Sequence, residues 1–257
     1  MNLFKTLVLL FSFSAFANFN FADLSQSDLD SMSKEIGANF SHSTVTPGAP
    51  MGNIFGFQVG LVAGVTSSAE LERLAKREDP TTDLEYVPTA GVMGVLTVPF
   101  GITVEATVLP SLDTDNADLS NISGAVRWSF FNAAIVDFAI RGHFSSGEMS
   151  YTDTVESINS EITIKHTTMG AHLIATADLP FIKPYAGVGF ISHDTDWSIN
   201  TTASLFNFTS ADNANSSESS AHLIAGVEAN LLLFNLGVEY SSMFDTHRYM
   251  TKLSIGF

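Results

Sequence analysis

Cysteine is absent from the 257 residues, and charged side chains make up only 15% of them. The absence of cysteine excludes a disulfide framework, a thiolate metal site and cysteine catalysis. Basic residues number 11 against 27 acidic ones, so the basic surface of a nucleic-acid binder is missing as well. A soluble domain carries about 25% charged residues. With 21 Phe and 18 Gly, this composition is closer to that of a membrane β-barrel.

Long hydrophobic runs are also missing. The apolar run from Thr6 to Phe13 is shorter than the roughly 20 residues that a membrane-spanning helix needs. It follows the basic residue Lys5 and precedes Ala15-Phe16-Ala17, which has the small residues of a signal-peptide cleavage site. Together these features predict a signal peptide over residues 1–17. A mature chain without membrane helices spans a bilayer only as a closed barrel.

Residues 54–257 contain about ten segments in which apolar and polar or small side chains alternate. In the first, Val59 and Leu61 alternate with Gln58 and Gly60. Such segments, at about the length of a tilted membrane strand, are typical of transmembrane barrels. The predicted strands are 54–66, 88–98, 101–110, 119–130, 134–148, 160–178, 183–196, 219–232, 234–244 and 248–257. We therefore predict an all-β, antiparallel up-and-down transmembrane barrel of about ten strands. Eight or twelve strands, or a secreted soluble sandwich, are the alternatives.

Short and long connections alternate along this series. The tight ones are Pro99-Phe100, Phe131-Asn132, residues 179–182 and Leu233-Phe234, and the others are longer and polar apart from a short last one. Short periplasmic turns and longer outer loops are typical of outer-membrane barrels. An even strand number then puts both termini on the periplasmic side.

The last residues alternate along one face and end on an aromatic side chain: Tyr249, Thr251, Leu253, Ile255 and Phe257. This pattern resembles the C-terminal assembly signal of Gram-negative outer-membrane barrels. The stretch from Lys183 to Gly189 also resembles a strand opening of small OmpA-type barrels. The resemblance implies an outer-membrane location in a Gram-negative bacterium. Its implied partners are the lipid bilayer and, through the C-terminal strand, the barrel-insertion machinery.

The strand alternation directs charged side chains into the lumen: Glu105, Arg127, Asp137, Arg141, Glu228, Glu239 and Lys252. Arg127 is expected near Glu105 and Asp137, and Lys252 near Glu239. Because buried charges normally persist only when paired, an ion network that closes a narrow lumen is favoured over a charged constriction that selects a solute. The inward histidines are spread over three strands without metal-ligand spacing, and the sequence predicts no metal and no cofactor.

Residues 18–53 precede the barrel and are predicted to form a periplasmic extension with a short helix. Ser27 is the expected cap of this helix from Asp28 to about Ile36, and Gly37 the expected stop. The extension is short and polar, so a linker is favoured over a plug. A plug would favour gated transport.

Three groups of outer-loop residues suggest chemistry. Asp113 and Asp115, opposite Asp245 and His247, resemble the catalytic acid and Asp-His pairs of omptin proteases, although their position in the loops differs from that family. His143-x-Ser145 resembles the His-x-Ser of outer-membrane lipases, but both side chains face inward.

A third, acidic group suggests Ca²⁺ binding: Asp113, Asp115, Asp118, Asp194 and Asp196. No loop shows an EF-hand pattern, so a solvated loop surface is favoured over a Ca²⁺ site. The favoured function is therefore a non-enzymatic envelope or surface barrel whose loops form the interaction surface, with the ligand unknown. The alternatives are a narrow or gated conduit for a small or hydrophobic solute, and an omptin-like hydrolase.

Overall fold

The chain forms a closed antiparallel barrel in which every strand pairs with its neighbours in the sequence and the last strand pairs with the first. The computed structural model describes residues 25–52, 54–78, 80–113, 117–155, 158–201 and 213–256. The predicted signal peptide and Phe257 lie outside these residues. Within them, neither helix has the length and apolar character needed to cross a bilayer.

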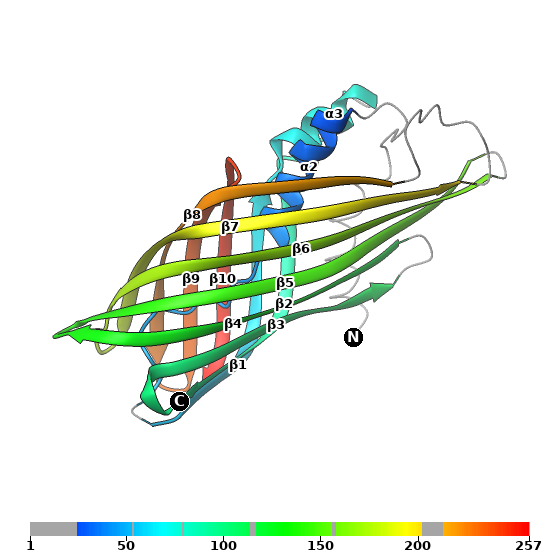
Figure 1. Ribbon diagram of the computed structural model, residues 1–257. Helices are drawn as coiled ribbons and strands as arrows, with labels where there is room; N and C mark the ends of the chain where they lie inside the picture. Colours follow the sequence, from blue (N-terminus) through cyan, green and yellow to red (C-terminus); the bar gives the residue numbers. More distant parts are fainter. Residues whose placement is uncertain are drawn as a thin grey trace.

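Ten strands build the barrel, which confirms the predicted fold class and strand number (Figure 1). Their bounds are β1 Gly56–Ser67, β2 Tyr86–Val98, β3 Ile102–Asp113, β4 Ala117–Ala133, β5 Val136–Val155, β6 Ile158–Ala177, β7 Ile182–Thr201, β8 Asn213–Leu231, β9 Phe234–Met243 and β10 Thr246–Gly256. A 3-10 turn, η2 (Pro99–Gly101), joins β2 to β3.

Strands β4, β5, β7 and β8 are longer than the sequence predicts. They have 17, 20, 20 and 19 residues, whereas about 9–11 residues suffice to cross a bilayer. Stretches that the sequence assigned to polar loops continue the strand ladder instead. We call the end of the barrel with the tight connections the turn end and the opposite one the loop end. The C-terminal strand finishes at the turn end (Figure 1).

The two faces of the barrel wall differ as the alternation predicts. Outward side chains form an apolar surface that includes Val59, Leu61, Val104, Phe144, Leu173, Phe190 and Leu253, each about half exposed or more. Inward side chains are polar or charged and buried, for example Thr103, Arg127, Thr168 and Ser241. An apolar outside around a polar inside is the arrangement that a bilayer requires of a barrel.

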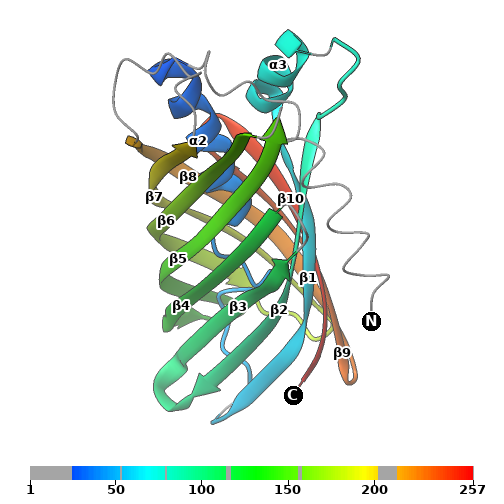
Figure 2. The same ribbon diagram turned by 90° about the vertical axis from the view of Figure 1, so that its right-hand side faces the viewer.

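Two helices lie at the loop end, α2 (Gln26–Phe40) before the barrel and α3 (Ala69–Glu78) between β1 and β2. Figures 1 and 2 show α3 and the start of α2 at this end, with the rest of α2 running down into the barrel. Ser25, rather than Ser27, caps α2 through a capping box with Asp28. The helix also runs through Gly37 to Phe40, because Gly37 packs against the ring of His193, where an added Cβ would lie 2.5 Å from Cγ.

The chain after α2 passes through the barrel to the start of β1, as the blue trace in Figure 2 shows. Residues 41–49 are all buried. We call residues 41–50 the lumen segment. The linker interpretation is therefore wrong for these residues, since they occupy the lumen. The division of the chain at residues 17 and 53 and the periplasmic side of the extension stay predictions.

Candidate functional site: the lumen and the segment inside it

Polar contacts from strands all around the barrel hold the lumen segment. Ser43 Oγ donates to Glu239 Oε1 at 2.8 Å, and Thr44 Oγ1 to Glu105 Oε2 at 2.6 Å. Near the turn end, Gly48 N donates to Thr176 Oγ1 at 2.7 Å and Gly48 O accepts from Ser129 at 2.6 Å. A buried backbone needs such partners, and here the barrel wall supplies them.

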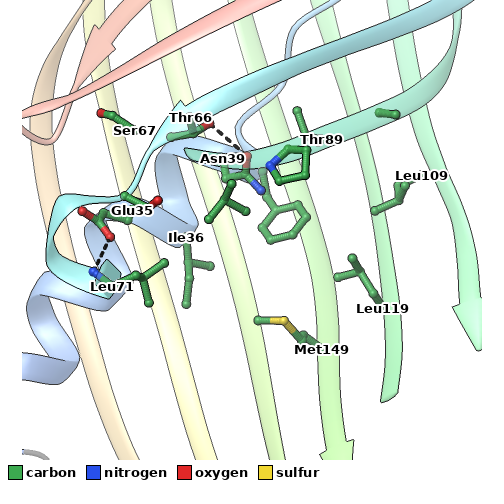
Figure 3. Close-up of a pocket in the computed structure, with 15 residues that line it drawn as sticks. Glu35, Ile36, Asn39, Thr66, Ser67, Leu71, Thr89, Leu109, Leu119 and Met149 are labelled. Atoms are coloured by element: carbon green, nitrogen blue, oxygen red, sulfur yellow. Dashed lines mark hydrogen bonds between the residues drawn. The ribbon is translucent and has the colours of Figure 1, made fainter. Parts of the chain in front are cut away.

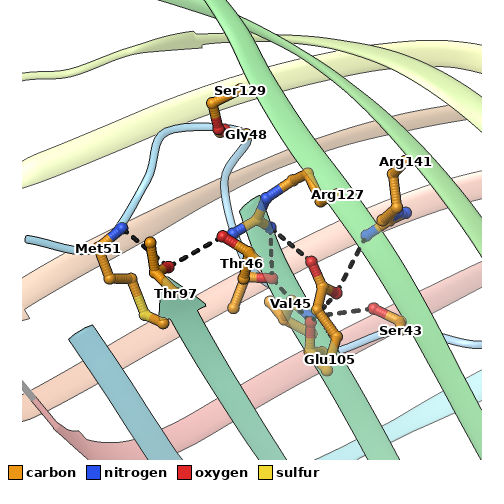
Figure 4. Close-up of polar contacts among 12 residues, drawn as sticks. Ser43, Val45, Thr46, Gly48, Met51, Thr97, Glu105, Arg127, Ser129 and Arg141 are labelled. Carbon is orange, nitrogen blue, oxygen red and sulfur yellow. Dashed lines mark hydrogen bonds and ion pairs between the residues drawn. The ribbon is translucent and has the colours of Figure 1, made fainter. Parts of the chain in front are cut away.

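Glu105 on β3 is shared between the wall and the lumen segment. It pairs with Arg127 Nη1 at 2.7 Å and lies 3.8 Å from Arg141 Nη1. His42 Nε2 is 3.3 Å from the same carboxylate, and Arg127 also donates to Thr46 Oγ1 at 3.0 Å. Figure 4 shows this group of side chains around the lumen segment. The segment therefore adds hydrogen-bond partners to an ion network of the wall.

The structure buries all seven charged residues that the sequence assigned to the lumen, but pairs some of them differently. Lys252 pairs with Glu228 rather than with Glu239. Glu239 accepts from Tyr185 and Ser43 instead, each at 2.8 Å. Asp137 accepts from Asn132 at 2.9 Å rather than pairing with Arg127. The alternation along a strand predicts whether a side chain faces the lumen. It does not predict which partner that side chain contacts there, because the lumen also contains residues 41–50.

Arg248 is a lumen residue that the sequence analysis missed. It lies on β10, 1% exposed, and donates through Nη1 to Ala38 O at 3.1 Å and Ser41 O at 2.7 Å. These carbonyls are at the C-terminal end of α2, where orphan acceptors and the negative end of the helix dipole favour a cation. The outward side chains of Tyr249 and Thr251 already implied that Arg248 points inward.

Above this polar layer, an apolar cluster closes the loop end. Leu29, Met32 and Ile36 of α2 and Leu71 and Leu74 of α3 pack together. The wall side chains in the same cluster come from the ends of the long strands: Leu109, Leu119, Met149, Ile164 and Trp197. We call this cluster the cap.

A cavity of about 30 Å³ lies at the edge of the cap, between α2 and the first strands (Figure 3). Its lining includes Ile36, Phe40 and Leu109, with Asn39 hydrogen bonded to Thr66 at 2.9 Å. One water needs roughly 10–15 Å³ on this measure. The cavity has room for about two waters and is too small for an organic solute, so it is a packing gap in the cap.

Three inward histidines lie close together in the structure, although their spacing in the sequence did not predict a shared site. Possible ligand nitrogens of His143, His172 and His222 all lie within 4.8 Å of one another, and all three side chains are buried. Their distances in sequence gave no metal spacing because the ligands come from β5, β6 and β8. Only the barrel register brings them to one level.

Of the residues compared with the omptin catalytic groups, the described part of the chain includes Asp245 and His247 with their side chains. His247 is exposed and its Nδ1 is 2.8 Å from the hydroxyl of Tyr240. Asp115 and the side chain of Asp113 lie outside the described part of the chain, so the acid pair stays a prediction. His143 and Ser145 do point inward, but Ser145 Oγ donates to Phe40 O at 2.6 Å and so helps to hold the end of α2.

The predicted assembly signal lies on the outer face of β10. Tyr249, Leu253 and Ile255 are 49%, 50% and 54% exposed. β10 pairs along its length with β1, from Gln58 opposite Gly256 to Thr66 opposite Arg248, so it forms the closing seam of the barrel. Its recognition by insertion machinery stays a prediction.

Comparison with known proteins gives a family but no activity. The family model that matches residues 8–256 is described as a family of unknown function, DUF6588. No curated protein matches the chain.

Several solved structures resemble the chain, and those described here are outer-membrane barrels. The translocator domain of the autotransporter NalP from Neisseria meningitidis is 11% identical, with 90% of this chain and 95% of that one covered and a TM-score of 0.45. The Ralstonia pickettii toluene transporter TbuX is 6% identical, with 80% and 89% covered and a TM-score of 0.35. The attachment invasion locus protein Ail of Yersinia pestis is 9% identical, with 80% and 100% covered and a TM-score of 0.29. Similarity at this level says nothing about what this chain does.

Proposed function

Because the chain belongs to DUF6588, a family of unknown function, its role has to be inferred from the structure, and we propose that it is a gated conduit in an outer membrane. In this proposal the lumen segment is the gate, and the solute that passes is small. The observation that carries the proposal is that residues 41–49 are buried inside the barrel.

The chemistry of the gate supports a segment that leaves and returns. Its contacts with the wall are mainly hydrogen bonds and ion pairs, through Ser43, Thr44, Thr46 and Gly48. Water replaces such contacts at moderate net cost, since one hydrogen bond contributes about 0.5–1.5 kcal/mol beyond what water offers, or about 1.5–3 kcal/mol where one partner is charged. Apolar packing on the segment is limited to a small cluster around Val45.

A strained backbone within the gate supports the same proposal. Val45 has φ +52°, a left-handed conformation that is a genuine outlier for a β-branched residue. Such conformations cost about 1–3 kcal/mol and persist where the surroundings impose them. Here the wall imposes it on a residue that is fully buried, so release of the segment recovers part of that energy.

A disulfide between the gate and the wall tests the proposal directly. An added Cβ at Gly48 would lie 3.3 Å from the Cβ of Ala139 on β5, near the separation of about 3.8 Å found in disulfides. The chain has no cysteine of its own, so the double variant Gly48→Cys/Ala139→Cys forms no other intramolecular bridge. The two single variants control for the substitutions themselves.

The readout is single-channel conductance in planar bilayers. The natural chain and the single variants should show intermittent conductance steps. The oxidised double variant should be silent and should recover its steps on reduction. Permanent silence of the natural chain and both single variants, or steps in the oxidised double variant that match those of the natural chain, would contradict the gated conduit.

The second candidate is a permanently closed surface barrel whose loop end binds a partner. The cap favours it, because its apolar packing of α2 and α3 against five wall side chains is costlier to open than the polar layer. The same bilayer measurement separates the two functions, since a permanently closed barrel never conducts, either before or after reduction of the disulfide.

A further inference from the structure

The three-histidine cluster lies in the polar layer of the lumen beside the gate proposed above, where the rings of His143 and His42 stack with their centroids 6.3 Å apart. His143, His172 and His222 are 6%, 2% and 0% exposed. His172 Nε2 lies 2.7 Å from His222 Nδ1, and the rings of His143 and His172 stack with their centroids 5.0 Å apart. Each residue offers one ligand nitrogen, and these three nitrogens lie within 4.8 Å of one another.

Most ring nitrogens of the cluster lack a hydrogen-bond partner. Among the described residues this holds for both nitrogens of His143, for Nδ1 of His172 and for Nε2 of His222. Buried polar atoms are nearly always satisfied, and an exception calls for an explanation such as a bound ion. Four such atoms in one cluster are a feature that packing alone does not explain.

Glycines in the barrel wall make the room in which these imidazoles meet. Gly189 on β7 is opposite His172 on β6 and opposite His222 on β8, so no side chain separates the two rings. Gly170 is opposite His143, and an added Cβ there would lie 2.5 Å from His143 Nε2. The strand register therefore places glycine across from every member of the cluster.

We propose that His143, His172 and His222 form a binding site for a late first-row divalent metal ion such as Zn²⁺. Neutral imidazoles are preferred ligands of zinc, copper and nickel ions. Three of them with one open position are an established zinc ligand set.

The observed spacing is close to what such an ion requires. Nitrogens bound to one zinc ion at about 2.0–2.1 Å lie roughly 3.4 Å apart. From separations of up to 4.8 Å, small rotations of the rings are enough.

The charges around the cluster set the expected affinity. Arg141 lies opposite His172 in the β5–β6 register, and its positive charge opposes a cation. Arg248 also acts electrostatically on all three rings. Glu105 lies 3.8 Å from Arg141 Nη1 but pairs more closely with Arg127, at 2.7 Å, so it offsets only part of this positive charge. A site with neutral ligands and partly compensated arginines nearby should bind zinc with micromolar rather than picomolar affinity.

The test is zinc titration of the full-length barrel, purified without a polyhistidine tag, treated with chelator and followed by calorimetry. One ion per chain is expected. The variant His172→Gln should weaken binding at least tenfold. His166→Gln is the matched control, because His166 is also buried in the lumen with both ring nitrogens unpartnered but is outside the cluster; this variant should bind like the natural chain.

Two further measurements keep the result interpretable. Migration of unheated samples on gels reports whether each variant has folded into a barrel. Electron paramagnetic resonance of a bound Cu²⁺ ion should show coupling to three nitrogens in the natural chain and fewer in His172→Gln. The proposal is overturned if the folded natural chain binds no zinc at micromolar concentrations, or if His166→Gln loses affinity as much as His172→Gln does.

Discussion

At the scale of single residues, the most informative contact is between Gly237 on β9 and Val45 in the lumen segment. An added Cβ at Gly237 would lie 2.9 Å from Val45 Cγ1 and 3.1 Å from Val45 O. With glycine at position 237, the strained segment therefore lies closer to the wall than a residue with a side chain at that position would allow. Because Val45 already has φ +52°, the segment has little freedom to adjust.

We expect Gly237→Ala to displace the lumen segment and to raise the open probability of the channel severalfold. The physical reason is that a methyl group at this position forces the backbone of Val45 away from the wall, which weakens the neighbouring polar contacts. The measurement is conductance in planar bilayers. Gly94→Ala is the matched control, since an added Cβ at Gly94 on β2 meets nothing within 4 Å. Identical traces from the two variants would mean that the segment is not held by this contact.

At the scale of elements, the docking of α2 on α3 depends on Glu35. Its carboxylate accepts from Glu70 N at 2.8 Å and from Leu71 N at 2.9 Å, at the first turn of α3. Figure 3 shows the bond to Leu71. Burial raises the pKa of Glu35 to about 7, and the nearby Glu70 adds to this, although the two backbone hydrogen bonds and Arg73 act in the opposite direction. The docked state therefore favours the protonated carboxyl group.

This pKa predicts how the cap responds to pH. Below about pH 4.5 the carboxyl is protonated whether the helices are docked or apart, and docking is at full strength. As the pH rises toward about 7, the Glu35 carboxyl ionises in the undocked state before it does so in the docked state. This ionisation stabilises the undocked state, so docking weakens by up to about 3 kcal/mol. A spin label at Lys76→Cys on α3 should become more mobile over this range. Glu35→Gln should abolish that change, and an unchanged profile in this variant would assign the effect to another group.

The elements themselves were largely predictable from the sequence, and the contents of the lumen were not. Period-2 alternation gave all ten strands because a wall between lipid and a polar interior repeats the same constraint at every second residue. It underestimated the lengths of β4, β5, β7 and β8, whose ends face the cap and the loops rather than lipid.

The position of residues 41–50 was predicted wrongly from the sequence, because a short polar segment between a helix and a strand favours a linker, and the wall residues that hold it come from distant strands. The histidine cluster was hidden for a different reason. It depends on which residues of β5, β6 and β8 share one level of the barrel, and sequence spacing does not fix that register when the connections vary in length.

At the scale of the whole molecule, the two tryptophans report on opposite sides of the barrel wall. Trp128 on β4 points outward and is 52% exposed, whereas Trp197 on β7 is 2% exposed and packs in the cap. If the apolar outer surface is the membrane-facing one, only Trp128 is in contact with lipid. Each residue can be observed alone in the variants Trp197→Phe and Trp128→Phe.

Lipids with brominated acyl chains quench only the tryptophans that they touch, so they test this arrangement in reconstituted vesicles. We expect the fluorescence of Trp128, observed in Trp197→Phe, to be quenched severalfold more than that of Trp197, observed in Trp128→Phe. Acrylamide in the aqueous phase controls for access from water and should quench both residues weakly. Equal quenching of the two by brominated lipid would contradict the assignment of the outer face to the bilayer. It would also remove the basis for treating the lumen as the route between two compartments, because a conduit needs a membrane around its wall.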